Sequence, residues 1–370
     1  MPEPMVSAQR AVSGDEPGPA AVEKSATVQE AARPATVRLM NAAARIATAA
    51  SARAGEETPT LGFTPKDFVL FGVPYKNPGT PIYTRRNGAQ TFRITSGVHG
   101  VPFGQDRLLI IWLATAFKVC GSPETNAISF DSLAAVARAL GKDTAGRKLN
   151  RIKLGFLRLF DATFLATDSR PGASQRDRYQ LMRRMRLANE IAPSRSNQFT
   201  MWPNVLLYDE VFAADIRADA IPTDLQSVRA LGENMGPLSL YQWEAYNSYV
   251  HARHNRPDRC VPILGASGLL AQIGCQVAER DTRFARATIR KWHGIVKTLW
   301  PSCPNELVNN DTGMIVRAGY AMQHGRLPRA DEFGVRPLAP ATLEQLGAAG
   351  ASVLERARAL PPREPQLDEG

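Results

Sequence analysis

The stretch that most constrains the fold of this chain is basic and amphipathic, and it runs from Asp281 to Trp300 directly after Arg280. At 100° per helical residue its basic side chains fall on one side, with His293 at their edge. These are Arg283, Arg286, Arg290 and Lys297. The apolar residues on the opposite side are Ala285, Ile289, Trp292, Val296 and Leu299. The pattern predicts a helix that packs on a core with one face and presents cations to an anionic polymer with the other.

The segments around this helix follow a recognisable order. Leu240–His251 predicts a first helix, and Ser267–Ile273 a short second helix that Gly274 ends. After the basic helix, Glu306–Asn309 and Met314–Ala318 predict a β-hairpin. Its turn residues are Asn310, Asp311 and Gly313. A helix, a short helix, a basic helix and a hairpin form the layout of a winged helix-turn-helix.

The same order occurs earlier in the chain. The predicted helices are Gln105–Val119, Asp131–Leu140 (capped by Asp131 or Ser129 and ended by Gly141) and Arg147–Phe160. The predicted strands are Ile82–Thr84, Thr91–Thr95, Ala162–Thr167, Tyr179–Ala188 and Gln198–Leu207. Phe156 and Leu159 follow Gly141 at the distances at which Ile289 and Trp292 follow Gly274. We therefore expect an α+β fold, mainly α, with two tandem winged helix-turn-helix domains.

Both basic helices contain residue types that bind DNA. On the first, Arg147, Arg151 and Arg158 lie together with Lys148 beside them, opposite an apolar stripe. In a helix-turn-helix the N-terminal half of such a helix enters the major groove, where Arg can donate two hydrogen bonds to guanine. We expect Arg283 and Arg286 to contact bases. The expected phosphate contacts are Arg290, Lys291 and Lys297. A solvated surface, a membrane or calmodulin are the alternative interpretations of such helices.

A second basic stretch, Gln175–Arg186, contains five Arg and one Asp. It falls where a wing would follow the first basic helix, and wings contact the DNA backbone or the minor groove. The candidate residues there are Arg183, Arg184 and Arg186. An exposed basic loop without a partner is the alternative.

Charge separates a central region from two tails. Residues 61–325 carry 33 basic and 21 acidic residues, and the whole chain has a formal charge of +10. A basic core favours an acidic partner, although a merely basic soluble protein has the same balance. The expected organisation is a tail at 1–60, disordered to 34 and Ala-rich helical at 35–54, then a first domain at 61–225, a sequence-reading domain at 226–325, and a tail at 326–370 with a helix near 341–359.

Signals for other classes of protein are weak. The spacing of Cys120, Cys260, Cys275 and Cys303 fits no zinc site, and buried free thiols in a reducing cytoplasm are expected. No apolar run reaches the roughly 20 residues of a membrane span. The HARH run at 251–254 lacks the His spacing of a nickase, and no Walker motif occurs. Trp112, Trp243 and Trp292 fall on apolar faces. We expect a cytoplasmic protein that is not an enzyme and that uses neither cofactor nor metal.

Three runs resemble the plasmid-encoded RepA replication initiators: VHGVPFGQDRLLIIWLATAFKV (98–119), SFDSLAAVARALG (129–141) and GRKLNRIKLGFLRLFDATF (146–164). The resemblance covers about 61–320. Its hallmark is a Pro-Phe-Gly turn followed by Arg-Leu-Leu. Here the hallmark residues are Pro102, Phe103, Gly104, Arg107, Leu108 and Leu109, with Arg158, Leu159 and Phe160 at the end of the third helix.

The resemblance implies an initiator that binds repeats at a plasmid origin, opens the nearby duplex and recruits the host replication initiator and helicase. It implies two winged-helix domains and autoregulation through dimers. Because the first domain of that family carries dimer contacts, Arg147 and Arg151 would serve phosphate contact rather than base readout. A winged-helix transcriptional repressor remains the alternative, followed by a nickase or recombinase.

Overall fold

The computed structural model describes residues 34–55, 58–122, 124–172, 175–187, 204–275, 281–322 and 324–338. The chain divides into two compact units, Met1–Asn41 and Ala42–Gly370. The Ala-rich helix predicted at 35–54 is confirmed as α1 (Pro34–Ala54). The disorder predicted for residues 1–34 lies outside these ranges, except for Pro34. The helix predicted near 341–359 also lies outside them. The domain limits at 60, 225 and 325 stay predictions.

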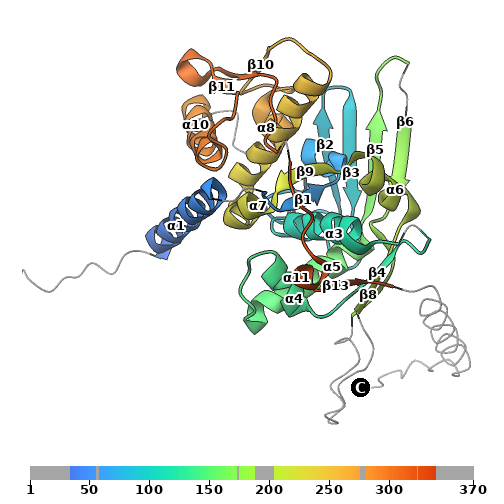
Figure 1. Cartoon of the computed structure of the whole chain (residues 1–370). Coiled ribbons are helices and arrows are strands. Elements are labelled where there is room, and N and C mark those ends of the chain that lie inside the picture. Colours follow the sequence, from blue (N-terminus) through green and yellow to red (C-terminus); the bar gives the residue numbers. More distant parts are fainter. Residues whose placement is uncertain are drawn as a thin grey trace, which may run out of the picture. The chain divides into compact units, whose positions relative to one another are not determined.

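The larger unit is α+β and begins with an alternation of short strands and helices (Figure 1). Up to residue 231 its elements are β1 (Leu61–Thr64), α2 (Lys66–Leu70), β2 (Ile82–Asn87), β3 (Gln90–Thr95), α3 (Asp106–Cys120), β4 (Ala127–Phe130), α4 (Leu133–Ala139), α5 (Gly146–Asp161), β5 (Thr163–Asp168), β6 (Gln175–Tyr179), β7 (Met182–Arg186), β8 (Asn204–Tyr208), α6 (Glu210–Asp219), β9 (Ile221–Asp224) and α7 (Leu225–Leu231).

The elements after residue 231 reproduce the predicted helix, short helix, basic helix and hairpin. They are α8 (Met235–Arg253), β10 (Arg259–Pro262), α9 (Leu269–Ile273), α10 (Thr282–Leu299), β11 (Glu306–Leu307), a 3-10 turn at Asn309–Asp311, β12 (Gly313–Val316), α11 (Ala330–Phe333) and β13 (Val335–Pro337). β10, β12 and β11 form one antiparallel sheet in that order, with Glu306 opposite Ile315. This is a winged helix-turn-helix arrangement, and its first strand, β10, has no counterpart in the sequence prediction.

The first set of elements is more elaborate than the prediction. The β5–β6 hairpin that follows α5 joins β2 and β3 in a sheet of order β2-β3-β5-β6. β4 lies instead in a second sheet, of order β13-β4-β8-β7. β13 comes from the predicted C-terminal tail, and Val335 pairs there with Phe130. Residues 330–337 therefore contribute to the folded unit.

Local backbone chemistry fixes the short helices. Gly141 and Gly274 end α4 and α9 in the left-handed conformation, with φ of 65° and 75°. Only glycine adopts that conformation without strain, so both predicted terminators are confirmed. The cap of α4 is different from the prediction. Ser132, rather than Asp131 or Ser129, accepts a 3.1 Å hydrogen bond from Ala135 N, because Ser129 belongs to β4.

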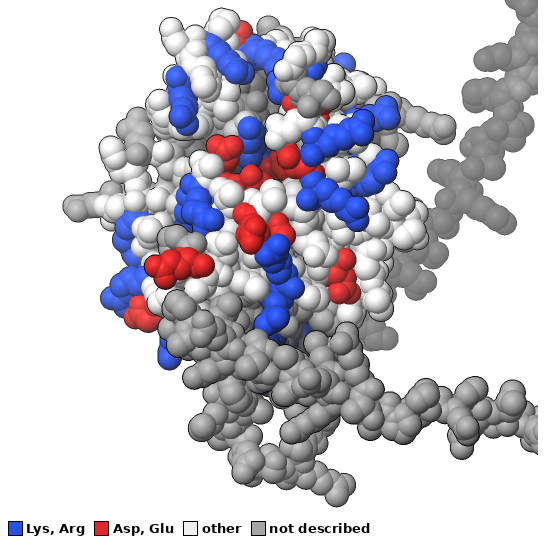
Figure 2. Space-filling view, turned by 90° about the vertical axis from the view of Figure 1, so that its right-hand side faces the viewer, with Lys and Arg blue, Asp and Glu red and all other residues white. Residues whose placement is uncertain are grey.

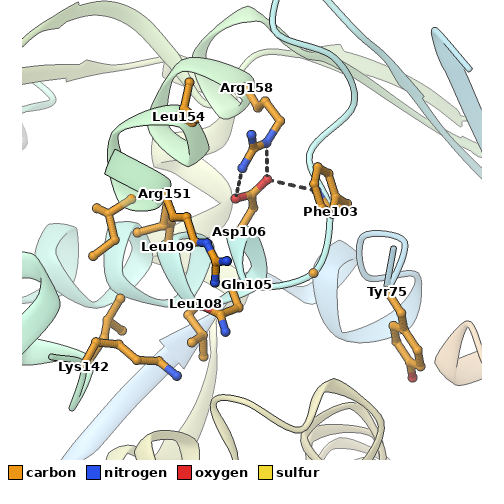
Figure 3. A pocket seen from close by; sticks show the side chains of 13 residues that line it. Tyr75, Phe103, Gln105, Asp106, Leu108, Leu109, Lys142, Arg151, Leu154 and Arg158 are labelled. Carbon is orange, nitrogen blue, oxygen red and sulfur yellow. Dashed lines mark hydrogen bonds and ion pairs between the residues drawn. The ribbon is translucent and has the colours of Figure 1, made fainter. Parts of the chain in front are cut away.

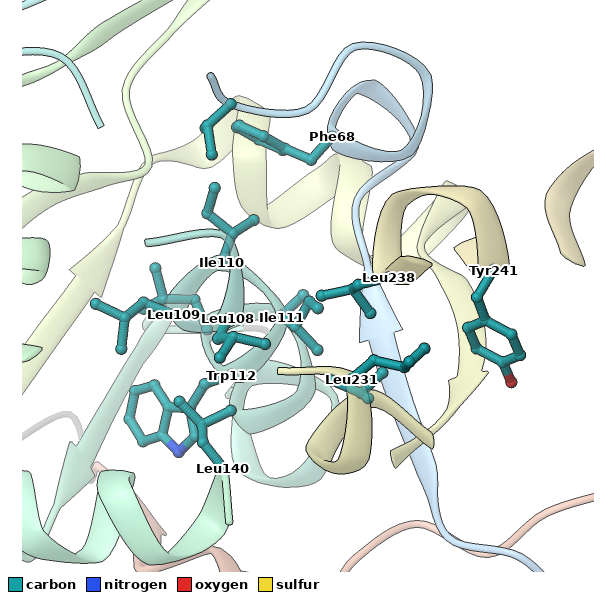
Figure 4. Packing of buried hydrophobic residues seen from close by; sticks show 14 of the residues in the cluster. Phe68, Leu108, Leu109, Ile110, Ile111, Trp112, Leu140, Leu231, Leu238 and Tyr241 are labelled. Atoms are coloured by element: carbon teal, nitrogen blue, oxygen red, sulfur yellow. The ribbon is translucent and has the colours of Figure 1, made fainter. Parts of the chain in front are cut away.

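The hydrophobic core is built around α3, whose residues are buried on every side from Leu108 to Phe117. A helix that is apolar all round must be surrounded by other elements. Trp112 is fully buried against Phe130 and Phe156, and Leu231 and Leu238 approach α3 from α7 and α8 (Figure 4). This single core supports both basic helices.

Candidate nucleic-acid interface

The basic helix α10 is amphipathic as predicted. Its buried residues are Ala285, Ile289, His293, Val296 and Leu299. Asp281 caps it by accepting a 2.9 Å hydrogen bond from Phe284 N. Trp292 is half-buried against α8, where a Cβ at Gly236 would overlap its ring. The apolar face thus sets how α10 lies on α8.

The N-terminal half of α10 carries the residues expected to contact bases. Arg283 is exposed, and Arg286 is half-buried. The Nε of Arg286 is buried and has no hydrogen-bond partner within the described ranges. Arg283 and Arg286 thus lie at the end of the helix where a helix-turn-helix contacts base edges.

Phe284 is a candidate contact residue that the charge pattern of α10 did not predict. Its side chain is 56% exposed beside Arg283, which is unusual for a large aromatic group. An apolar side chain at this position of a groove-binding helix can contact a thymine methyl group. The signal was present in the sequence, because Phe284 departs from the apolar face that Ala285 and Ile289 define.

The three residues expected to contact phosphate have different surroundings. Lys291 is exposed on α10. Arg290 forms an ion pair with Asp311 in the turn of the hairpin. Lys297 donates a 2.8 Å hydrogen bond to the carbonyl oxygen of Cys303, just beyond the helix. Two of the three cations therefore tie α10 to the segments that follow it.

His293 lies on the buried side of α10, not at the edge of the exposed basic side. Its Nδ1 is 3.0 Å from Oε1 of Glu244 on α8, a fully buried carboxylate. The other oxygen of Glu244 accepts hydrogen bonds from Cys303 Sγ at 3.1 Å and Asn305 Nδ2 at 3.3 Å. Glu244 on α8 thereby contacts both α10 and the segment between α10 and β11. Burial and Glu244 together raise the pKa of the Cys303 thiol, which keeps it a donor.

On the first basic helix, α5, the N-terminal half is the exposed part. Arg147, Lys148 and Arg151 are all exposed, and Lys148 Nζ is 3.1 Å from Asp143 Oδ2. Arg158 is different, because it forms two hydrogen bonds with Asp106, at 2.7 and 2.8 Å, and stacks over the Phe103 ring. Arg158 therefore has a structural role at the start of α3.

The segment Gln175–Arg186 is not a single wing. Its first half is β6, the second strand of the hairpin that follows α5, and its second half is β7, which belongs to a different sheet. The expectation of a wing is therefore wrong for the half that carries Arg183, Arg184 and Arg186. Arg183 on β7 is 2.9 Å from Glu210, and Arg184 is exposed. Arg186 is half-buried. The hairpin in the wing position after α5 is β5–β6.

A cavity of about 500 Å³ lies beside α5 (Figure 3). Leu108, Leu109 and Ile152 line it, with Lys142 and Arg151 at the polar parts of its wall. Burial lowers the pKa of Lys142 to about 8, and Glu233, 3.8 Å away, only partly opposes this. The Arg158–Asp106 pair closes one side of the cavity.

Arg107, one of the residues that carry the RepA resemblance, joins the first set of elements to the second. It is buried, and its guanidinium donates to Gln242 Oε1 at 2.9 Å, Ser239 Oγ at 2.6 Å and Phe68 O at 3.1 Å. Burial lowers its pKa to about 10.

A second set of contacts between the first and second sets of elements lies at the carboxyl end of α9. Arg85 donates to Ala271 O at 2.6 Å, and the Tyr75 hydroxyl donates to Ile273 O at 2.9 Å. Both partners are carbonyl groups in the last turn of α9, where a cation is favoured. The helix that precedes α10 is thus held by residues from β2 and the loop before it. Sequence patterns did not indicate these contacts.

Cys303 is buried, but Cys260 is exposed, so the expectation of buried thiols is wrong for Cys260. Trp112 and Trp243 are core residues as predicted. Across the described segments, no cluster of three or more His, Cys, Asp or Glu could hold a metal ion. None of the described helices combines the length and the apolar character that crossing a membrane requires.

No protein-family model matches this chain, and no curated protein matches it. The solved structures that are similar to this chain include two of RctB. The crystal structure of RctB domains 2-3 has 16% sequence identity and a TM-score of 0.38, over 60% of this chain and 80% of that chain. The selenomethionine derivative of domain 2 and domain 3 of RctB has 13% identity and a TM-score of 0.39, over 61% and 82%. Because both the sequence identities and the TM-scores are low, the function has to be inferred from the chain's own residues.

Proposed function

We propose that this chain binds double-stranded DNA in a sequence-specific manner and initiates plasmid replication at repeated origin sites. The observation that carries the DNA-binding part is α10. In its N-terminal half Arg283 and Phe284 are exposed and Arg286 is half-buried, and this half follows the short helix α9 and the Gly274 turn. Arg and an apolar side chain at these positions match the base contacts made by other helix-turn-helix proteins.

α5 has a supporting role in this proposal. The phosphate contacts on this helix are Arg147, Lys148 and Arg151. Further positive charge comes from β7, which follows α5 in the chain and carries Arg183, Arg184 and Arg186. Arg290 and Lys291 contact phosphate next to the bases that α10 reads, and Lys297 supports the end of the helix. These contacts raise affinity for any DNA without selecting a sequence.

The initiator part of the proposal rests on the resemblance of 98–164 to the RepA proteins. On that basis the chain acts on plasmid DNA in a bacterial cytoplasm, forms monomers and dimers, and recruits the host replication initiator and helicase to the opened origin. It carries out no chemical step itself. A repressor with the same fold would bind the same repeats and leave the duplex closed.

Two experiments test the two parts separately. Selection of binding sites from a pool of random duplexes should enrich one motif, and failure to enrich any motif would contradict sequence-specific binding. A plasmid that carries this gene and its flanking DNA should replicate in a host without another initiator. Binding without replication would favour the repressor, and nicking of supercoiled plasmid with Mg²⁺ would favour the enzyme.

A further inference from the structure

The four-stranded sheet β2-β3-β5-β6 has one covered face and one free face. Phe92, Ile94, Phe164 and Tyr179 point inward and are buried. Because side chains alternate along a strand, the residues between them point to the opposite face. This outward face, called here the sheet face, is not part of α5 or α10.

The register of the sheet places its outward residues in rows. The first row is Arg86, Thr91, Thr167 and Arg176, and the second is Thr84, Arg93, Leu165 and Arg178. The four arginines are exposed. Within the ranges that the structure describes, no hydrogen bond or ion pair engages their guanidinium groups. The outward positions of these four strands contain no Asp or Glu.

The acidic residues of the same strands lie on the inward side. Asp168 accepts a 3.0 Å hydrogen bond from Gln90 Nε2. Asp177 lines a cavity together with Asp67, Asp215 and Asp219. Figure 2, which looks onto the side that carries β6 and α6, shows acidic side chains gathered near the middle of that side, with Lys and Arg on both sides of them. On β3, β5 and β6 the arginines thus lie on the outward side and the aspartates on the inward side, whereas β2 also has the buried Arg85 on its inward side.

The residue types on the sheet face define its partner. Arginine guanidinium and threonine hydroxyl groups are the side-chain donors that contact phosphate and sugar in DNA complexes. β6 spaces Arg176 and Arg178 by about 7 Å, close to the axial rise of two phosphates along one strand of B-DNA, which is about 7 Å. No aromatic side chain points outward from these four strands, so the face lacks the stacking platform that single-stranded nucleic acid requires.

We propose that the sheet face binds the sugar-phosphate backbone of duplex DNA outside the bases that α10 reads. The inference rests on the proposed DNA-binding function and extends it. The footprint of the protein would be longer than the α10 site alone, and the added contacts would be independent of sequence.

The test compares two duplexes that share the selected α10 site. The short duplex ends at the site, and the long duplex continues for about 20 base pairs on each side, enough for several added phosphate contacts. The test variant carries Arg86→Gln, Arg93→Gln, Arg176→Gln and Arg178→Gln. The matched control neutralises four basic residues on other segments, with Lys76→Gln, Arg138→Gln, Arg256→Gln and Arg336→Gln.

We expect the test variant to bind the long duplex at least about 10-fold more weakly than the wild type. Its plot of log affinity against log salt should be shallower by about 0.9 for each phosphate that the variant no longer neutralises. Binding to the short duplex should change less than about 2-fold, and the control variant should behave as the wild type on both duplexes to within the same factor. Equal weakening for test and control variants on the long duplex would overturn the inference.

The outcomes separate this inference from the proposed function. If the wild type selects no motif and binds no duplex, the proposed function fails. If the wild type binds its motif and the test variant binds the long duplex normally, only the sheet face is excluded. If the four substitutions weaken binding to single-stranded DNA more than binding to the long duplex, the sheet face binds a different ligand. That result would also overturn the inference.

A second measurement covers the case in which the test variant does not fold. A photo-crosslinking amino acid at Thr95, on the sheet face, should crosslink to the flanking part of the long duplex. The same amino acid at Lys76 should not. Crosslinks from neither position, with normal binding to the motif, would exclude the sheet face.

Discussion

His293 on α10 and Glu244 on α8 form a buried pair, with Nδ1 and Oε1 3.0 Å apart. The pair connects the helix expected to read DNA to the helix it packs on. Glu244 is fully buried and also accepts hydrogen bonds from Cys303 and Asn305. The orientation of α10 thus depends on a polar network that a charge pattern alone does not reveal.

Replacing His293 by Ala should lower the free energy of unfolding by about 3 kcal/mol, because it leaves a buried carboxylate without its main partner. His293→Gln, which keeps a hydrogen-bond donor, should lower it less. Urea unfolding of both variants measures the difference. Equal stability of His293→Ala and wild type would show that the pair does not hold α10 in place.

Lys291 and Lys297 should behave differently when each is changed to Ala. Lys291 is exposed, so its removal should weaken binding to all duplexes and lower the salt slope by about 0.9. Lys297 is bonded to the Cys303 carbonyl, so its removal should lower stability and alter the salt slope less. Filter binding at several salt concentrations distinguishes them. A larger slope change for Lys297→Ala would restore that residue as the phosphate contact.

Asp215 should make stability depend on pH. Burial raises its pKa to about 6, and the neighbouring Asp67, Asp177 and Asp219 add to the shift. A carboxyl with a raised pKa favours folding in its protonated form, so its contribution is present below about 4 and is lost as pH rises to about 6. Asp215→Asn should reduce this dependence and stabilise the protein at pH 7 by less than about 1 kcal/mol, since the carboxyl is only partly buried and solvent screens its charge. Thermal unfolding between pH 4 and 7 measures it, and an unchanged pH profile in the variant would contradict the assignment.

Arg107→Met should lower the free energy of unfolding by about 2 kcal/mol, because it removes the donor shared by Ser239, Gln242 and the Phe68 carbonyl. A double-mutant cycle with Gln242→Leu should show a coupling of about 1 kcal/mol. A variant more stable than the wild type would mean that the unfavourable desolvation of the guanidinium exceeds its hydrogen bonds.

The elements that local sequence defines were predictable. The stripes of α5 and α10 follow from helical periodicity, and Gly141 and Gly274 end their helices because a left-handed residue is needed there. The β11–β12 hairpin follows from its turn residues. Each of these depends on residues within one or two turns of one another.

What could not be predicted depends on partners distant in sequence. β4 and β13 are short strands that pair across about 200 residues, and no local pattern indicates such a pairing. Arg107 and Arg158 have basic side chains like the DNA-contact candidates, yet Gln242 and Asp106 engage them. The rows of the sheet face become visible only when the register of four strands is known. Charge at a helical position therefore indicates a candidate, and the packing decides its role.

The central claim is that α10 reads DNA sequence through Arg283 and Arg286. Its most direct test is the affinity of Arg283→Ala and Arg286→Ala for the selected motif and for random duplex of equal length. Each variant should lose about 1–3 kcal/mol of binding free energy on the motif, with little change on random DNA. Equal weakening on both duplexes would show that these residues contact only phosphate and would contradict the account.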